Sequence, residues 1–124
     1  MIRSVIIVKS EGELFCPVKA TMRLLGQKWT LQIIHALSGK KMRFNELAQT
    51  VGGINSRTLS QRLRELEFEG IVARRTISSI PPWVEYELTE KGKSLADVVE
   101  SIAEWGKAWM ETPSRQSPRE ADHI

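Results

Sequence analysis

Residues 43–89 constrain the fold more than any other part of this chain. The first part of this segment, RFNELAQTV, carries apolar residues at helical spacing and predicts a short helix. Gly52 and Gly53 then supply a turn, and NSRTLSQRLRELE predicts a second helix with Asn55 as its N-cap. IVARRTI and VEYELT predict the two strands of a hairpin, joined by a loop over residues 78–82. This order is typical of a helix-turn-helix followed by a wing, which places one helix in a DNA major groove.

Three more helices are predicted outside this segment. Cys16-Pro17 opens the first, since proline is favoured at the first helical position, and Gly26 ends it. Residues 28–37 predict the second, and their apolar side chains spread so widely around the helix that a central place in the core is expected. Thr89 caps the last helix, which runs to about residue 111. One face of the first helix should be apolar, through Val18, Met22 and Leu25. The predicted fold is mainly α with a small β-hairpin wing (α+β), a winged helix-turn-helix.

The chain divides into three predicted regions. Residues 1–15 form an N-terminal arm, in which the β-branched run at 5–8 suits either a short strand or a helix packed on a partner. Residues 16–111 form the winged helix-turn-helix domain with a C-terminal dimerisation helix. Residues 112–124 are polar and contain proline, so a disordered tail is expected.

Charge is unevenly distributed along the chain, although the net charge is only +3. Residues 40–75 hold eight Lys or Arg against four Glu, whereas residues 85–111 hold seven acids against three Lys. This asymmetry suits one surface directed at an anionic polymer, but scattered solvated charge would look the same. One cysteine excludes an intramolecular disulfide framework, and no stretch is long enough to span a bilayer. The expectation is a cytoplasmic protein with no membrane partner.

The helix after Asn55 carries the residues best suited to reading DNA. Leu59, Leu63 and Leu66 should face the core, so the 3.6-residue period places a polar and basic face opposite them. Arginine can read guanine with its bidentate fork and glutamine can read adenine, while serine permits close approach. The alternative is an amphipathic helix with a merely solvated polar face. The candidate DNA-binding residues of this helix are Ser56, Arg57, Thr58, Ser60, Gln61 and Arg64.

Basic residues on either side of this helix are candidates for phosphate contacts. Such contacts would supply affinity and salt dependence rather than sequence choice, and the alternative for each is a free surface charge. Trp83 on the wing could wedge against sugars or pack on a neighbouring subunit. The flanking candidates are Lys41 and Arg43 before the third helix, and Arg74 and Arg75 on the first wing strand.

Beyond these arguments, the chain resembles the HxlR family of winged helix-turn-helix transcription regulators, which are related in fold to MarR regulators. The runs that carry the resemblance are CPVKATMRLLGQKWTLQIIHAL, RFNELAQTVGGINSRTLSQRLRELEFEGIVAR, PPWVEYELTEKGKSL and AEWG, over residues 16–111. The resemblance implies a homodimer on a pseudo-palindromic operator, with the recognition helix at residues 55–67 and the wing at residues 74–84. Two departures are visible. The family often carries a basic residue where Trp83 stands, and residues 1–15 are not part of the pattern.

An apolar stripe on the last helix predicts homodimerisation. It exposes more apolar surface than so small a core needs, so a partner helix is expected, although the stripe could instead pack within its own subunit. The predicted interface residues are Leu95, Val99, Ile102, Trp105 and Trp109.

Cys16 is a candidate redox sensor, because the dipole at a helix start favours the thiolate. The resemblance also implies it, since some HxlR regulators sense oxidants or electrophiles through a cysteine in this region. The alternative is a small hydrophobic residue that packs the first helix. A small-molecule or oxidant effector fits the sequence, but no residue identifies one.

No catalytic constellation or cofactor motif stands out, so neither an enzyme nor a bound cofactor is expected. His35 has no ligand partner at metal spacing and is expected to be a satisfied core or interface histidine, so no metal site is predicted. The leading hypothesis is a sequence-specific DNA-binding transcription regulator. The alternative is a winged-helix protein-interaction module that does not bind DNA, and the exposed face of the helix after Asn55 separates the two.

Overall fold

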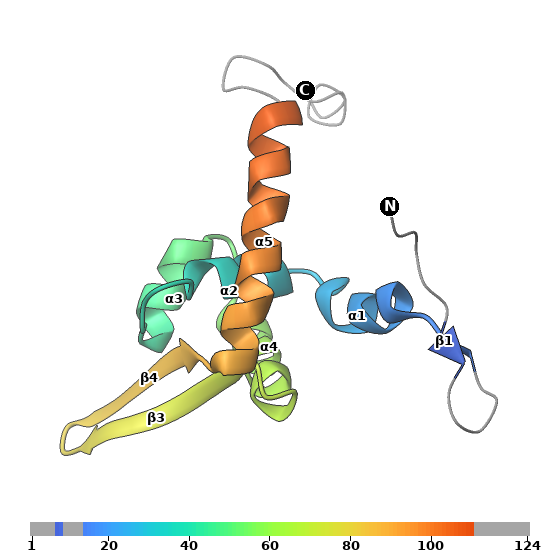
Figure 1. Cartoon of the computed structure of the whole chain (residues 1–124). Helices are drawn as coiled ribbons and strands as arrows, with labels where there is room; N and C mark the ends of the chain where they lie inside the picture. The colour runs from blue at the N-terminus through green and yellow to red at the C-terminus, as the bar shows by residue number, and fades with distance from the viewer. Residues whose placement is uncertain (1–6, 9–13, 111–124) are drawn as a thin grey trace.

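The structure is a computed structural model, and it describes residues 7–8 and 14–110 (Figure 1). In chain order these residues form β1 (Ile7–Val8), β2 (Leu14–Phe15), α1 (Pro17–Leu25), α2 (Thr30–Ala36), α3 (Phe44–Val51), α4 (Ser56–Phe68), β3 (Val72–Ser79), β4 (Pro82–Leu88) and α5 (Glu90–Trp109). The predicted winged helix-turn-helix is confirmed. The predicted tail, residues 112–124, lies outside the described residues.

The core lies where α2, α3 and α4 meet the base of the hairpin and the first turns of α5 (Figure 1). Each of these helices contributes fully buried aliphatic side chains, and α2 contributes two adjacent isoleucines, as a central helix should. The least exposed members are Ile33, Ile34, Leu37, Leu47, Leu59, Leu63, Leu66 and Ile71. The core therefore holds α4 in place through its three buried leucines.

Helix α2 begins later than the predicted residue 28. Trp29 is its N-cap and has a φ of 82°, a left-handed conformation that a continuing helix cannot contain. The Trp29 ring is half-buried and packs beside Gly53, in the turn before α4. His35 is exposed instead of lying in the core, and its Nε2 is 3.9 Å from Oε1 of Glu100 on α5.

The hairpin strands are longer than predicted, because β3 continues through residues 78 and 79 and β4 begins at Pro82. The connecting turn is therefore reduced to Ile80 and Pro81, which are joined by a cis peptide bond. The strands pair antiparallel from Val72↔Leu88 outward, with one irregularity between Thr76 and Ser78. Met42 also exchanges backbone hydrogen bonds of 3.0 and 2.8 Å with Tyr86, which ties the segment before α3 to the wing.

Helix α5 starts at a tight junction with the end of α4. The Thr89 hydroxyl accepts the Gly92 N–H at 3.0 Å, and it lies 2.5 Å from the Gly70 carbonyl oxygen, to which it donates. Gly92 packs so closely that an added Cβ would collide with the Ile71 carbonyl oxygen. From this junction α5 rises past the other helices, and its upper half stands clear of the body (Figure 1). None of the helices in the described ranges has the length and apolarity to cross a membrane.

Helix α1 lies to one side of the body and approaches it through its C-terminal end (Figure 1). Leu25 is buried, but Val18 and Met22 are exposed, so the apolar face predicted for α1 is only partly covered within the subunit. Within the arm, the described residues form a short antiparallel pair in which Ile7 lies opposite Phe15 and Val8 opposite Leu14. Of the two alternatives left open for this run, residues 7 and 8 form a strand.

Candidate nucleic-acid interface

Helix α4 presents a polar face outward because its leucines are all turned inward. Leu59, Leu63 and Leu66 are buried, as their spacing predicts. Arg57, Gln61 and Arg64 are exposed on the opposite side, and with the half-buried Glu65 they line a shallow hollow in the surface. Three long polar side chains therefore share one accessible surface.

The two arginines of this face carry charge that nothing in the described part of the chain neutralises. Neither Arg57 nor Arg64 forms an ion pair or side-chain hydrogen bond with another described residue. An arginine in this state keeps all five N–H donors available to an anionic or acceptor-rich ligand.

The first turn of α4 is capped but remains accessible. Asn55 accepts the Thr58 N–H at 2.8 Å through its side-chain oxygen, the bond expected of an N-cap. Ser56 is exposed, whereas Thr58 and Ser60 are half-buried. These two are therefore less accessible than Arg57 and Arg64.

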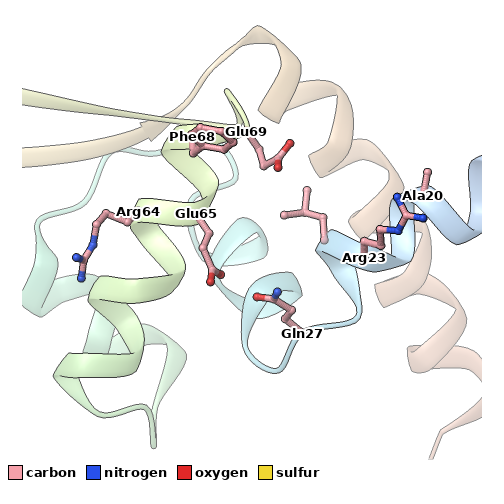
Figure 2. A pocket seen from close by; sticks show the side chains of 8 residues that line it. Ala20, Arg23, Gln27, Arg64, Glu65, Phe68 and Glu69 are labelled. Carbon is pink, nitrogen blue, oxygen red and sulfur yellow. The ribbon is translucent and has the colours of Figure 1, made fainter.

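One arginine of α4 has a structural position that the sequence did not single out. Nε of Arg62 donates to the Lys28 carbonyl oxygen at 2.9 Å, and its Nη1 donates to Oε1 of Glu65 at 3.4 Å. The bond to Lys28 fastens α4 to the turn before α2, whereas the bond to Glu65 lies within α4. In Figure 2, Glu65 points toward the side of α4 where Gln27 lies, whereas Arg64 points away from it. Glu65 is thus paired with Arg62 and not with Arg64, although it also lines the hollow beside the basic face.

The two wing arginines differ in availability. Arg75 on β3 is ion-paired with Glu87 on β4, which lies opposite Ala73, so the charge of Arg75 is already compensated. Arg74 is exposed and has no ion pair among the described residues. Of the pair, Arg74 is the better placed to meet an anion.

The segment before α3 brings further cations to the same side as the wing, since Met42 pairs with β4. Lys40, Lys41 and Arg43 are exposed, and the Arg43 N–H donates to Oε1 of Glu46 at 2.8 Å. The Arg43 guanidinium stacks on the Trp83 ring, with Cζ 3.4 Å from the ring centroid. The sequence pointed to both residues but not to this contact, which joins positions far apart in the chain.

Cys16 is half-buried and occupies the N-cap position of α1, immediately before Pro17. Its side chain makes no capping hydrogen bond. The thiol therefore lies at a helix start, as predicted, and retains partial access to solvent.

The apolar stripe on α5 divides into a covered and an uncovered part. Val99 is only 4% exposed and packs in the core of its own subunit, so it does not offer the free surface that an interface residue needs. Leu95 is half-buried against the same core. Toward the free end of α5, Ile102 is exposed, Trp105 is 60% exposed and Trp109 is 74% exposed. Val98, a residue of the same stripe that was not among the predicted interface residues, is also exposed.

Helix α1 is flanked by two open pockets. The first, of about 740 Å³, lies between α1 and α4 (Figure 2) and is lined by Ala20, Arg23, Leu24, Gln27, Arg64, Glu65, Phe68 and Glu69. The second, of about 360 Å³, lies between α1 and α5 and has a more apolar lining that includes Leu95 and Val98. Within its own subunit, α1 is therefore loosely covered on both flanks.

Comparison with known proteins gives a consistent result. The family model described as HxlR-like helix-turn-helix matches residues 24–114. A relative from Methanothermobacter thermautotrophicus, called an uncharacterized HTH-type transcriptional regulator, is 37% identical over 80% of this chain and 76% of its own length.

Solved structures agree with the sequence comparisons. A protein from Porphyromonas gingivalis W83 assigned to the MarR family superposes with a TM-score of 0.73 at 31% identity, covering 84% of this chain and 98% of its own. The oxidised form of the redox regulator HypR also superposes with a TM-score of 0.73, at 39% identity, covering 78% of this chain and all of its own, 100%.

Proposed function

Because the chain belongs to the HxlR-like helix-turn-helix family of DNA-binding transcription regulators, we propose that it binds a pseudo-palindromic operator as a homodimer. Helix α4 lies in the major groove, and the wing formed by β3 and β4 lies on the adjacent backbone or minor groove. Such a regulator works where chromosomal DNA is, in the cytoplasm.

The observation that carries this proposal is the outward face of α4. Arg57, Gln61 and Arg64 are exposed together, and no described acid pairs with either arginine. Arginine and glutamine are the side chains that pair bidentately with guanine and adenine in the major groove. A protein-interaction module would have no need to keep two arginines on one face without an acidic partner among the described residues.

The exposed part of α5 supports the homodimer. Ile102, Trp105 and Trp109 form an apolar surface at the end of α5 that the described residues do not cover. Large exposed apolar patches mark interaction sites, and a second copy of the chain offers a matching stripe. Two copies joined in this way place two recognition helices in a two-fold arrangement, which a pseudo-palindromic site mirrors.

Cys16 supports a second element of the proposal, control of binding by oxidants. Its half-buried thiol at the start of α1 is accessible, and HypR, a similar protein, is named a redox regulator. A peroxide would oxidise the thiolate to a sulfenic acid, releasing water, and the partner's Cys16 thiol would then condense with it to a disulfide, releasing a second water. Packing of α1 remains the simpler role of this residue.

Selection of binding sites from a random-sequence duplex library tests the regulator and the dimer together. The enriched duplexes should contain two inverted half-sites about one helical turn, or a multiple, apart. Enrichment of one unrepeated half-site would contradict the homodimer. If no duplex were enriched and the protein bound no DNA at low salt, the regulator hypothesis would be rejected in favour of the protein-interaction module.

The selected duplex then tests Cys16. Hydrogen peroxide should change the affinity of the wild type in fluorescence anisotropy and produce a disulfide-linked dimer on a non-reducing gel. Cys16→Ser should bind the duplex equally well and show neither response. Equal responses to peroxide in variant and wild type would refute thiol sensing.

A further inference from the structure

The stacking of Arg43 on Trp83 connects the start of α3 to the wing. Cζ of Arg43 lies 3.4 Å from the centroid of the Trp83 ring, within the range of a strong cation–π contact. The indole Nε1–H of Trp83 donates to Oε2 of Glu85 at 3.1 Å, two residues along the same strand. This bond uses the only polar donor of the indole. The ring face of Trp83 is the part that contacts Arg43.

Both residues stand on a backbone that is held in place. Met42, next to Arg43, exchanges two hydrogen bonds with Tyr86 of β4, the strand that carries Trp83. The Arg43 N–H is bonded to the Glu46 carboxylate at 2.8 Å. The backbone of Arg43 is therefore held by hydrogen bonds, and its guanidinium rests on a ring whose strand is held in the same way.

Stacking restricts the guanidinium without using its hydrogen-bond donors. The N–H groups of arginine lie in the plane of the guanidinium, so a ring beneath that plane leaves them free. Arg62 and Arg75 donate to Glu65 and Glu87, whereas Arg43 forms no ion pair within the described part of the chain. Arg43 thus retains its charge and its donors, held in one direction beside the wing.

We propose that Trp83 is a positioning residue that holds the Arg43 guanidinium ready to bind a phosphate of the DNA backbone beside the wing. The inference rests on the proposed function, since it assigns one contact of that interface. A preordered side chain loses less conformational freedom on binding, so the tryptophan raises affinity without touching DNA itself. The contact is independent of base sequence.

The probe is a fluorescein-labelled duplex of arbitrary sequence, titrated with the full chain by anisotropy at several salt concentrations. Arg43→Gln should lower the slope of log affinity against log salt by about one, the amount expected for one phosphate contact. Trp83→Leu should weaken binding about two- to tenfold, the cost of ordering one long side chain on binding. Trp83→Phe, which keeps an aromatic face, should recover most of that loss.

The double variant separates positioning from direct contact. If Trp83 acts through Arg43, Trp83→Leu should cost nothing further in the Arg43→Gln background. A full additional loss there would mean that Trp83 contacts DNA itself, and an unchanged affinity of Trp83→Leu in the wild-type background would equally overturn the inference. Lys107→Gln, which removes one charge at the far end of α5, is the matched control. Thermal melting of each variant shows that the fold is retained.

Failure of this inference is distinguishable from failure of the proposed function. Wild-type protein that binds the duplex in a salt-dependent way while the Arg43 and Trp83 variants match it would leave the regulator intact and remove only the positioning role. Wild-type protein that binds no duplex at low salt would overturn both.

Discussion

At the residue scale, neighbouring arginines of α4 have different surroundings because they lie on different sides of the helix. Arg57 and Arg64 are exposed without acidic partners, whereas Arg62 is bonded to the Lys28 carbonyl oxygen and the Glu65 carboxylate. Residue type alone cannot tell which of these three arginines is free and which is bonded, but their positions in the helical period can. Positions opposite the buried leucines meet solvent, and positions between the two faces meet neighbouring elements.

Removing one arginine of the outward face should weaken recognition of the operator. Arg57→Ala and Arg64→Ala are each expected to cost about 1–3 kcal/mol in binding free energy for the selected duplex and much less for a scrambled one. Lys41→Ala should instead lower the salt slope by about one and weaken both duplexes alike. Anisotropy titrations measure all three, with Lys107→Ala as a control. Unchanged affinity in both arginine variants would mean that α4 is not the recognition helix.

The N-cap of α4 offers a stability test at the same scale. Asn55→Ala removes the acceptor of the Thr58 N–H and is expected to lower the free energy of unfolding by about 1 kcal/mol. Urea denaturation followed by circular dichroism measures this change. Asn55→Asp, which keeps a side-chain acceptor, should restore most of it, and a variant as stable as wild type would show that the cap bond contributes little.

At the element scale, the junction between α4 and α5 determines how the long helix leaves the body. Gly70 follows the end of α4, Thr89 bonds back to it, and Gly92 lets α5 approach the Ile71 carbonyl. A side chain at position 92 would separate the two segments, since its Cβ would overlap with backbone that cannot move aside.

Gly92→Ala should therefore destabilise the fold by about 1–3 kcal/mol, the usual cost of overpacking. The midpoint of urea unfolding measures the change. Gly106→Ala on the same helix is a matched control, because a Cβ there meets only the Met110 side chain at 3.8 Å. That variant should be as stable as wild type or slightly more stable, since alanine is the better helix former. Equal stability of the two variants would contradict the tight junction.

Elements were predictable to the extent that local signals define them. Asn55 and Thr89 mark the starts of α4 and α5 in the sequence, and both caps are present. The start of α2 was predicted too early, because the left-handed Trp29 accompanies packing beside Gly53 and no local pattern announces it. The wing loop was predicted too long, because Ser79 and Pro82 pair across the hairpin despite their turn-like composition.

At the scale of the whole molecule, the uncovered end of α5 is the feature that a monomer does not explain. Trp105 and Trp109 are 60% and 74% exposed. They belong to the C-terminal half of α5, which stands clear of the body (Figure 1). An apolar stripe in such a position is stable in water when a second chain covers it.

Trp105→Glu should convert the proposed homodimer to a monomer, because it would bury a charge in an apolar interface. Sedimentation velocity measures the mass, and the same variant should lose most of its affinity for a pseudo-palindromic duplex while its circular dichroism stays unchanged. Lys107→Glu, on the opposite side of α5 by the helical period, is the matched control. A Trp105→Glu protein that still sediments as a dimer would move the interface elsewhere.

The order of helices, the hairpin, the caps of α4 and α5 and the basic face opposite Leu59, Leu63 and Leu66 could all be derived from the amino-acid order. Each depends on residues close together in the chain, where periodicity and capping act. The pairing of Arg43 with Trp83, the anchoring of Arg62 on Lys28 and the burial of Val99 depend instead on side chains from distant segments. Those contacts arise only when the core has packed, since packing sets the distances and angles between elements that local patterns leave open.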